Sequence, residues 1–219
     1  MLEETKLIDA KKELVEYATL VEGMIEHSIK GLKEKDVQVL TKVIEKDEPR
    51  ANELEIDMNE RCISLIARHQ PAGKALRTIL MLLNISNTLE RMGDHAVTIC
   101  ESALFLIEKP PVKPLIDIPR MAQIVIEMLK NTISAFVNED AELTQRVCQM
   151  DNTVDALRDQ ILRELITFMA SDPTTIERSL QLMKISSNLE RIADLSTNIC
   201  EDIVYIVKGK IIKHHFEEI

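Results

Sequence analysis

Two stretches of the sequence, SNTLERMGDHAVTICE at residues 86–101 and SSNLERIADLSTNICE at residues 186–201, share one pattern of acidic residues. In each, an aspartate follows a glutamate by four positions, and a second glutamate follows that aspartate by seven. The residues are Glu90, Asp94, Glu101, Glu190, Asp194 and Glu201. In a helix this spacing puts the three carboxylates of a stretch on one side. Carboxylate oxygens suit Mg²⁺, Ca²⁺, Mn²⁺ and iron, so each stretch is a candidate half of a cation site.

A further pair of carboxylates, Asp151 and Asp155, lies four positions apart in the long helix predicted before the second stretch. If the two helices cross, this pair can meet Glu190 and Asp194. A bound cation would then offset a like-charge repulsion of only about a few tenths of a kcal/mol per exposed pair. Because the repulsion is that small, spacing alone also allows an ordinary solvated helix face, which a duplication would simply copy.

The composition predicts an all-α protein with a substantial core. The 219 residues include only five glycines and seven prolines, and aromatic residues make up 3%. The abundant Leu, Ile, Met, Glu and Lys are strong helix formers. With 45% hydrophobic residues the chain has enough apolar material to fold, which argues against disorder.

The charge bounds the class of partner. A net charge of −10 and a pI near 5.1 exclude duplex nucleic acid as a main partner, because neutralising phosphates requires clustered Lys and Arg. No segment approaches the roughly 20 apolar residues of a membrane span, and the charged N-terminus is unlike a signal peptide. We therefore expect a cytoplasmic protein that reaches the membrane only through partners.

Apolar periodicity predicts six long helices, three on each side of the proline-rich stretch KPPVKPLIDIP. The two sets match each other at a constant shift of 104 in their first two helices and of 100 in the third. Short connections pack neighbouring helices antiparallel. The sequence therefore predicts two tandem, internally repeated three-helix bundles, residues 1–109 and 120–219, joined by a linker at residues 110–119.

Residues for catalysis are sparse. A ferritin-type di-iron enzyme uses Glu-x-x-His pairs, and none of the five histidines lies three residues after a glutamate. No Gly-rich phosphate loop occurs, and the four cysteines form no CxxC pair. The sequence thus predicts a protein that is not an enzyme. A carboxylate-bridged metal enzyme and a metal-free helical interaction protein stay open as alternatives.

Four segments together resemble the PhoU family of phosphate-transport accessory and regulatory proteins: NTLERMGDHAVTICE, SNLERIADLSTNICE, ERCISLIARHQP and VDALRDQILREL. The resemblance implies a cytoplasmic, non-enzymatic negative regulator of phosphate uptake and phosphate-starvation signalling. It implies as partners the ATPase subunit of the phosphate ABC transporter, a sensor histidine kinase and a second copy of the chain in a homodimer. It also implies divalent or iron cations (Fe, Zn, Mg, Mn or Ca) bound through paired carboxylate motifs.

Carried over by position, the resemblance assigns ligands in both halves. In the second half they are Asp151, Asp155, Glu190 and Asp194, and in the first half Glu90 and Asp94 are clear. Glu101 and Glu201 are weaker candidates.

The remaining first-half pair depends on the register. Counting from Leu54 selects Glu48 and Asn52, whereas counting from Val43 selects Asp47 and Ala51. We attribute the discrepancy to a helix start or kink at Pro49 and prefer Glu48 and Asn52. Because an asparagine replaces a carboxylate, we expect the first site to bind cations more weakly.

Overall fold

The protein is all-α, as its composition predicts. The computed structural model describes residues 4–208, and these contain no strand. The elements are α1 (Glu4–Glu34), α2 (Val37–Lys42), a π-helical turn (Val43–Asp47), α3 (Glu48–His69), α4 (Gly73–Ile107), α5 (Asp117–Asn138), α6 (Ala141–Ser171), a 3₁₀ turn (Pro173–Thr175) and α7 (Ile176–Lys208). Residues 209–219, which the sequence assigns to the second bundle, lie outside the described residues.

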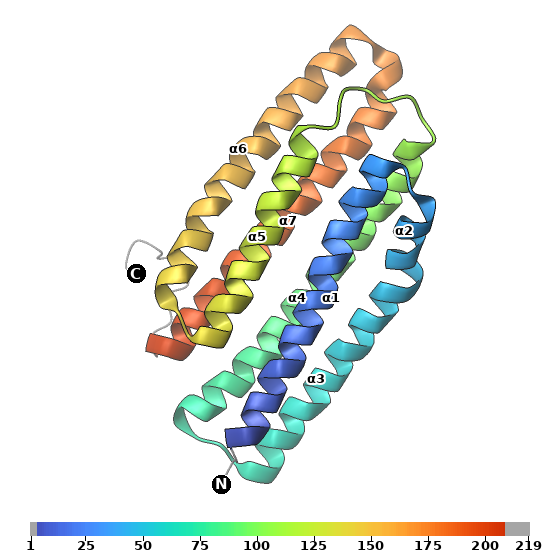
Figure 1. The fold of residues 1–219 in the computed structure, drawn as a ribbon. Helices are drawn as coiled ribbons and strands as arrows, with labels where there is room; N and C mark the ends of the chain where they lie inside the picture. Colours follow the sequence, from blue (N-terminus) through green and yellow to red (C-terminus); the bar gives the residue numbers. More distant parts are fainter. Residues whose placement is uncertain (1–3, 209–219) are drawn as a thin grey trace.

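The helices form two three-helix bundles that lie side by side (Figure 1). In the first bundle α3 packs on α1 and α4, and in the second α6 packs on α5 and α7. The bundles meet where α4 packs on α7 and α1 packs on α5. This arrangement leaves α3 and α6 on opposite outer sides of the molecule (Figure 1). The prediction of two tandem three-helix bundles is confirmed.

The turn after the first helix of each bundle has the same geometry in both halves. Lys35 and Glu139 have φ values of 58° and 55°, in the left-handed region that ends helices. The Oδ1 atoms of the next residues, Asp36 and Asp140, each accept hydrogen bonds from two backbone N–H groups at 2.9 and 3.1 Å. Such a cap contributes about 1 kcal/mol. The equal geometry at equal positions is what a duplication produces.

One apolar core runs through both bundles. One stripe of α4 is buried along its whole length: Leu82, Ser86, Leu89, Gly93, Ala96, Cys100 and Ala103. A fully buried Leu, Ile or Val side chain contributes about 1.5–3 kcal/mol. Burial of these stripes therefore fixes α4 and α7 against each other and holds the helices that carry the acidic residues.

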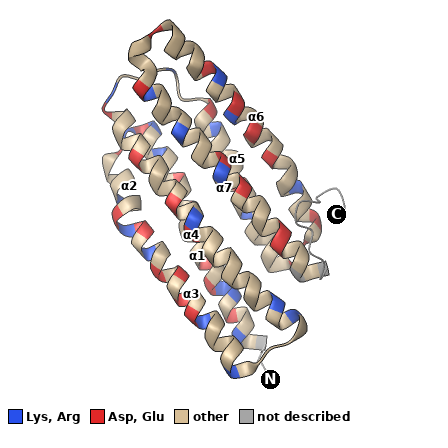
Figure 2. Cartoon of the chain, turned by 180° about the vertical axis from the view of Figure 1, so that it is seen from behind, with Lys and Arg blue, Asp and Glu red and all other residues tan. Residues whose placement is uncertain are grey.

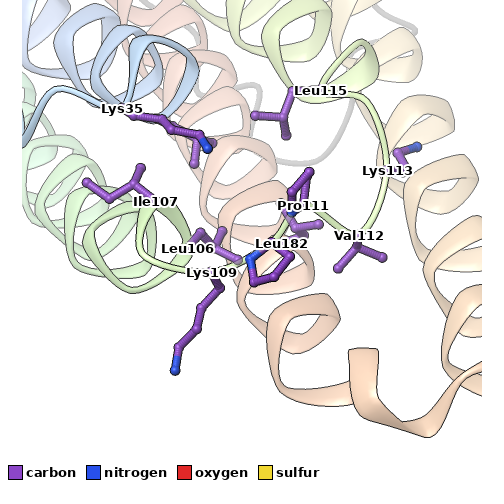
Figure 3. A pocket seen from close by; sticks show the side chains of 11 residues that line it. Lys35, Leu106, Ile107, Lys109, Pro111, Val112, Lys113, Leu115 and Leu182 are labelled. Carbon is purple, nitrogen blue, oxygen red and sulfur yellow. The ribbon is translucent and has the colours of Figure 1, made fainter.

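The proline-rich linker crosses between the bundles and packs on both (Figure 3). Its apolar residues lie near the ends of α1, α4 and α7, around a cavity of about 50 Å³. The Nζ atom of Lys113 is 2.8 Å from Oδ2 of Asp117 and also contacts the Glu164 carboxylate, which fastens the linker to α5 and α6. Helix α5 begins at Asp117, inside the predicted linker. Pro119 belongs to the first turn of α5, where a missing N–H does no harm.

A π-helical turn distinguishes the second helix of the first half from α6, which is α-helical throughout. In Val43–Asp47 each hydrogen bond spans one residue more than in an α-helix, so the turn takes up one extra residue. This insertion changes the register between the halves from 104 to 103. Pro49 lies just beyond this turn. The register therefore changes near the position that the sequence indicates, but the cause is the inserted residue rather than the proline.

Candidate carboxylate sites

In the second half, α6 and α7 bring four predicted carboxylates together. Asp151 and Asp155 lie on α6, and Glu190 and Asp194 lie on α7. Burial, followed by the charges of the other three carboxylates, raises the pKa of Asp151 to about 6. Burial and then Asp155 raise the pKa of Asp194 in the same direction. These mutual effects show that the four side chains are neighbours, and we call them the second cluster.

The second cluster has the chemistry of a cation site. The Oδ1 atom of Asp151 is buried and has no hydrogen-bond partner among the described residues. A buried polar atom without a partner costs about 1–3 kcal/mol, and a cation would remove that cost. Arg158 lowers the pKa of Glu190 against burial and Asp194, which raise it. Its guanidinium is shared, because Nη1 lies 3.1 Å from Oδ1 of Asp159.

In the first half, the matching side chains face each other across α3 and α4. Burial first and Glu48 second raise the pKa of Asp94. Burial and then Asp94 raise the pKa of Glu90. The Nδ2 atom of Asn52 donates a hydrogen bond to Oε1 of Glu48 at 2.8 Å. The structure thus brings Glu48, Asn52, Glu90 and Asp94 into one group, the first cluster.

The other register, with Asp47 and Ala51, does not face this cluster. Ala51 is buried in the core. A Cβ added at Gly93 would lie 4.0 Å from the Cβ atom of Ala51. The Oδ2 atom of Asp47 lies 2.7 Å from Nζ of Lys42, and its charge acts on the Cys100 thiol. The π-helical turn therefore sets the register that counting from the later residues predicts.

The sequence reasoning missed two residues that join the first cluster. Glu55, on α3, is among the charges that raise the pKa of Glu90. Tyr17, on α1, is 1% exposed, and burial followed by three carboxylates raises the pKa of its phenol far above the usual range. Glu55 continues the acidic face of α3 by one turn, so helical spacing could have found it. No sequence pattern singles out Tyr17.

The glutamates that end the paired stretches lie beside cysteines. Glu101 is exposed and acts on the Cys100 thiol, and Glu201 is half-buried and acts on Cys148 and Cys200. Neither is among the groups that raise the pKa values of the two clusters. The structure thus groups these weaker candidates with the thiols.

The clusters are loose arrangements. As the side chains stand in the described part of the chain, no three His, Cys, Asp or Glu are gathered closely enough to hold a metal ion. His95 follows Asp94 in the sequence, but its ring contacts another helix, because Nδ1 of His95 lies 2.8 Å from Oδ1 of Asn188 and links α4 to α7. A cation would therefore have to draw flexible carboxylates together, without histidine from this position.

The clusters lie along the outer sides of the molecule. Asp94, Asp155 and Asp194 are exposed, and Glu48, Asp151 and Glu190 are half-buried. Acidic residues recur along α3 and α6, with Lys and Arg between them (Figure 2). An ion or a partner can thus reach both clusters from solvent.

Within residues 4–208, no helix combines the length and the apolar character needed to cross a bilayer.

Comparison with known proteins decides the family. A family model described as the PhoU domain matches the chain twice, at residues 14–103 and 118–203. The chain belongs to the PhoU family. The phosphate-specific transport system accessory protein PhoU homolog of Aquifex aeolicus (strain VF5) is 37% identical over 214 residues, which cover 97% of this chain and 96% of that protein. PhoU of Escherichia coli (strain K12) is 32% identical over 195 residues, or 89% and 80% of the two chains.

The PhoU fold extends over nearly the whole molecule. The crystal structure of PhoU from Pseudomonas aeruginosa matches with a TM-score of 0.90 at 32% identity, covering 94% of this chain and 99% of that chain. Each of the two PhoU-domain matches falls on one bundle, and each contains one carboxylate cluster. The clusters are therefore equivalent features of two PhoU repeats.

Proposed function

We propose that this protein is a non-enzymatic regulator of phosphate uptake whose two carboxylate clusters bind cations. The observation that carries the cation part is the recurrence of the cluster, at equivalent positions of both repeats, although its charges repel one another. The names of the relatives support the phosphate part, since those of Aquifex aeolicus and Escherichia coli are accessory proteins of the phosphate-specific transport system.

Each cation is held between the outer helix of a bundle and the helix beside it. The ligands are Glu48, Asn52, Glu90 and Asp94 in the first half, and Asp151, Asp155, Glu190 and Asp194 in the second. Asn52 contributes its carbonyl oxygen. The ion is iron, zinc, magnesium, manganese or calcium, and the all-oxygen donor set favours the harder ions among them. The protein's contribution is to place these oxygens on two rigid helices, so that the ion ties α3 to α4 and α6 to α7.

The regulatory step is docking. The protein works in the cytoplasm as a homodimer and reaches the membrane through the ATPase subunit of the phosphate ABC transporter. Through the transporter and a sensor histidine kinase, it represses the phosphate-starvation response when phosphate is plentiful. A bound ion offsets negative charge on the outer faces of α3 and α6, and so changes which charged surface can approach them.

Deleting the gene in the native host should switch on phosphate-starvation genes even in phosphate-rich medium. Wild-type protein should restore repression, and a variant with E90Q, D94N, E190Q and D194N should restore it only in part. The matched control is E53Q with D57N, which neutralises two exposed carboxylates elsewhere on α3. Starvation genes that stay silent after the deletion would contradict the proposed function. Full repression by the cluster variant would contradict the regulatory use of the ions.

A further inference from the structure

The first cluster contains two groups that the second lacks. With the register of 104 that relates α1 to α5, Tyr17 corresponds to Met121. With the register of 103 that follows the π-helical turn, Glu55 corresponds to Arg158. A phenol and a carboxylate in the first half thus stand where the second half has a thioether and a guanidinium.

The buried Tyr17 hydroxyl has no hydrogen-bond partner among the described residues, although carboxylates lie near it. Tyr17 is 1% exposed, and its oxygen has no hydrogen-bond partner among the described residues. The charges that act on this phenol come from Glu90, Glu55 and Asp94, so the ring reaches from α1 toward the acidic face between α3 and α4. A buried O–H needs an acceptor, and the charged groups that act on this phenol are all carboxylates.

Glu55 changes the charge of the site. Its Oε1 accepts a hydrogen bond from Nδ2 of Asn59, which holds the side chain on the acidic face of α3. The first cluster then carries the four carboxylates Glu48, Glu55, Glu90 and Asp94. The second also carries four, but Arg158 cancels part of their charge, as its effect on Glu190 shows. Arg91 and Arg191 lower the pKa values of Glu90 and Glu190 in the same way, so Arg158 gives the second cluster one arginine more than the first. The first cluster therefore attracts an added cation more strongly.

We infer that the first half holds the tighter cation site, with Glu55 as a further ligand and Tyr17 as a positioning residue. The Tyr17 hydroxyl donates to a ligand carboxylate or to an ion-bound water and fixes its orientation. This inference rests on the proposed cation binding. It reverses the expectation of weak binding that the loss of charge at Asn52 suggests, because Glu55 replaces that charge one turn away.

The chain provides its own reporter for this site. It has no tryptophan and only two tyrosines, so Y205F leaves Tyr17 as the single tyrosine. Terbium ions bind carboxylate oxygens and emit when a nearby tyrosine transfers its excitation energy to them. Titration of Y205F with Tb³⁺ should give tyrosine-sensitised emission that E90Q with D94N abolishes and D151N with D194N leaves unchanged. Sensitised emission that persists in E90Q with D94N would overturn the assignment of Tyr17 to this site.

The individual roles need variants that keep the fold. In a D151N and D194N background, calorimetry with Mn²⁺ should show affinity about tenfold weaker for E55Q, and about fivefold weaker for Y17F, as expected for a charged ligand and a single hydrogen bond. E53Q, at an exposed position on the same helix, should change nothing. Y17F should also reduce the rise in Tm that Mn²⁺ causes, which a purely structural loss would leave unchanged. If Y17F does not fold, E55Q alone decides the relative strength of the two sites.

The outcomes separate this inference from the proposed function. If wild-type protein binds neither Mn²⁺ nor Tb³⁺, the cation sites themselves are wrong. If both ions bind, but E55Q and Y17F bind as well as their parent, only the assignment of Glu55 and Tyr17 is overturned. If the second site, measured in an E90Q and D94N background, proves tighter than the first, the inferred order of the two affinities is overturned.

Discussion

The two bundles share a backbone but differ in what surrounds their matching carboxylates. Glu90 and Asp94 recur as Glu190 and Asp194, and both pairs have raised pKa values because burial and like charges surround them. Around them, by contrast, the repeats have diverged, with an inserted π-helical turn and a different charge beside each cluster. Like charges that are retained beside diverged neighbours are what we expect if both halves bind cations, as we propose, but with different affinity.

The largest expected effect concerns packing near the first turn. Gly31 stands where the second half has Ala135, and a Cβ at Gly31 would lie 2.5 Å from Cγ of Leu40. The steric cost of G31A, about 3 kcal/mol, exceeds the gain in helix propensity of about 1 kcal/mol. We expect G31A to lose about 2 kcal/mol in urea unfolding. Adding L40T, which copies the Thr144 of the second half, should recover part of this loss. If the changes in the free energy of unfolding caused by G31A and L40T simply add, the clash between a Cβ at position 31 and Leu40 is contradicted.

The second prediction exchanges charge between the halves. Replacing Arg158 by glutamate removes one of the two arginines that lower the pKa of Glu190, and it copies Glu55. We expect R158E to tighten Mn²⁺ binding at the second cluster about tenfold, measured by calorimetry in an E90Q and D94N background. R163E makes the same charge change at an exposed position on α6 and should have little effect. Equal effects of the two variants would mean that net charge, rather than the cluster, governs affinity.

Sequence reasoning predicted the helices and the repeat, because apolar periodicity and duplicated motifs can be recognised in the order of the residues. It also selected Glu48 and Asn52, because the residues after the inserted one keep their own register. It could not show the π-helical turn, because in the sequence one inserted residue appears only as a change of the shift between the halves from 104 to 103. It missed Tyr17, because a tyrosine on an apolar stripe reads as core until its hydroxyl is seen without a partner.

The start of α5 was missed for a related reason. Pro119 lies in a segment rich in proline, which reads as linker, yet proline is well tolerated in the first turn of a helix. The structure is needed to show that the helix begins at Asp117. Arg158 was missed because its charge matters through its distance from Glu190, on another helix.

The third and smallest expected effect is the contribution of Asp151, in the second half, to the pH dependence of stability. Folding raises the pKa of Asp151 from about 4 to about 6, so the folded state binds this proton more tightly than the unfolded state does. The free energy of unfolding therefore falls as pH rises through this window. Because the group is partly exposed and screened, we expect about 1 kcal/mol. In chelator, D151N should make this fall smaller in urea unfolding curves, whereas D159N, at an exposed position on the same helix, should leave it as in the wild type. A slope unchanged in D151N would contradict the account of this carboxylate.

The central claim is that each half gathers carboxylates from two adjacent helices into its own cation site. Equilibrium dialysis against Mn²⁺, followed by elemental analysis, tests it most directly in wild type, in E90Q with D94N, in D151N with D194N, and in the variant with all four changes. We predict that each pair of changes removes only the manganese of its own half, and that the fourfold variant binds none. A fourfold variant that keeps the manganese content of the wild type would contradict the claim.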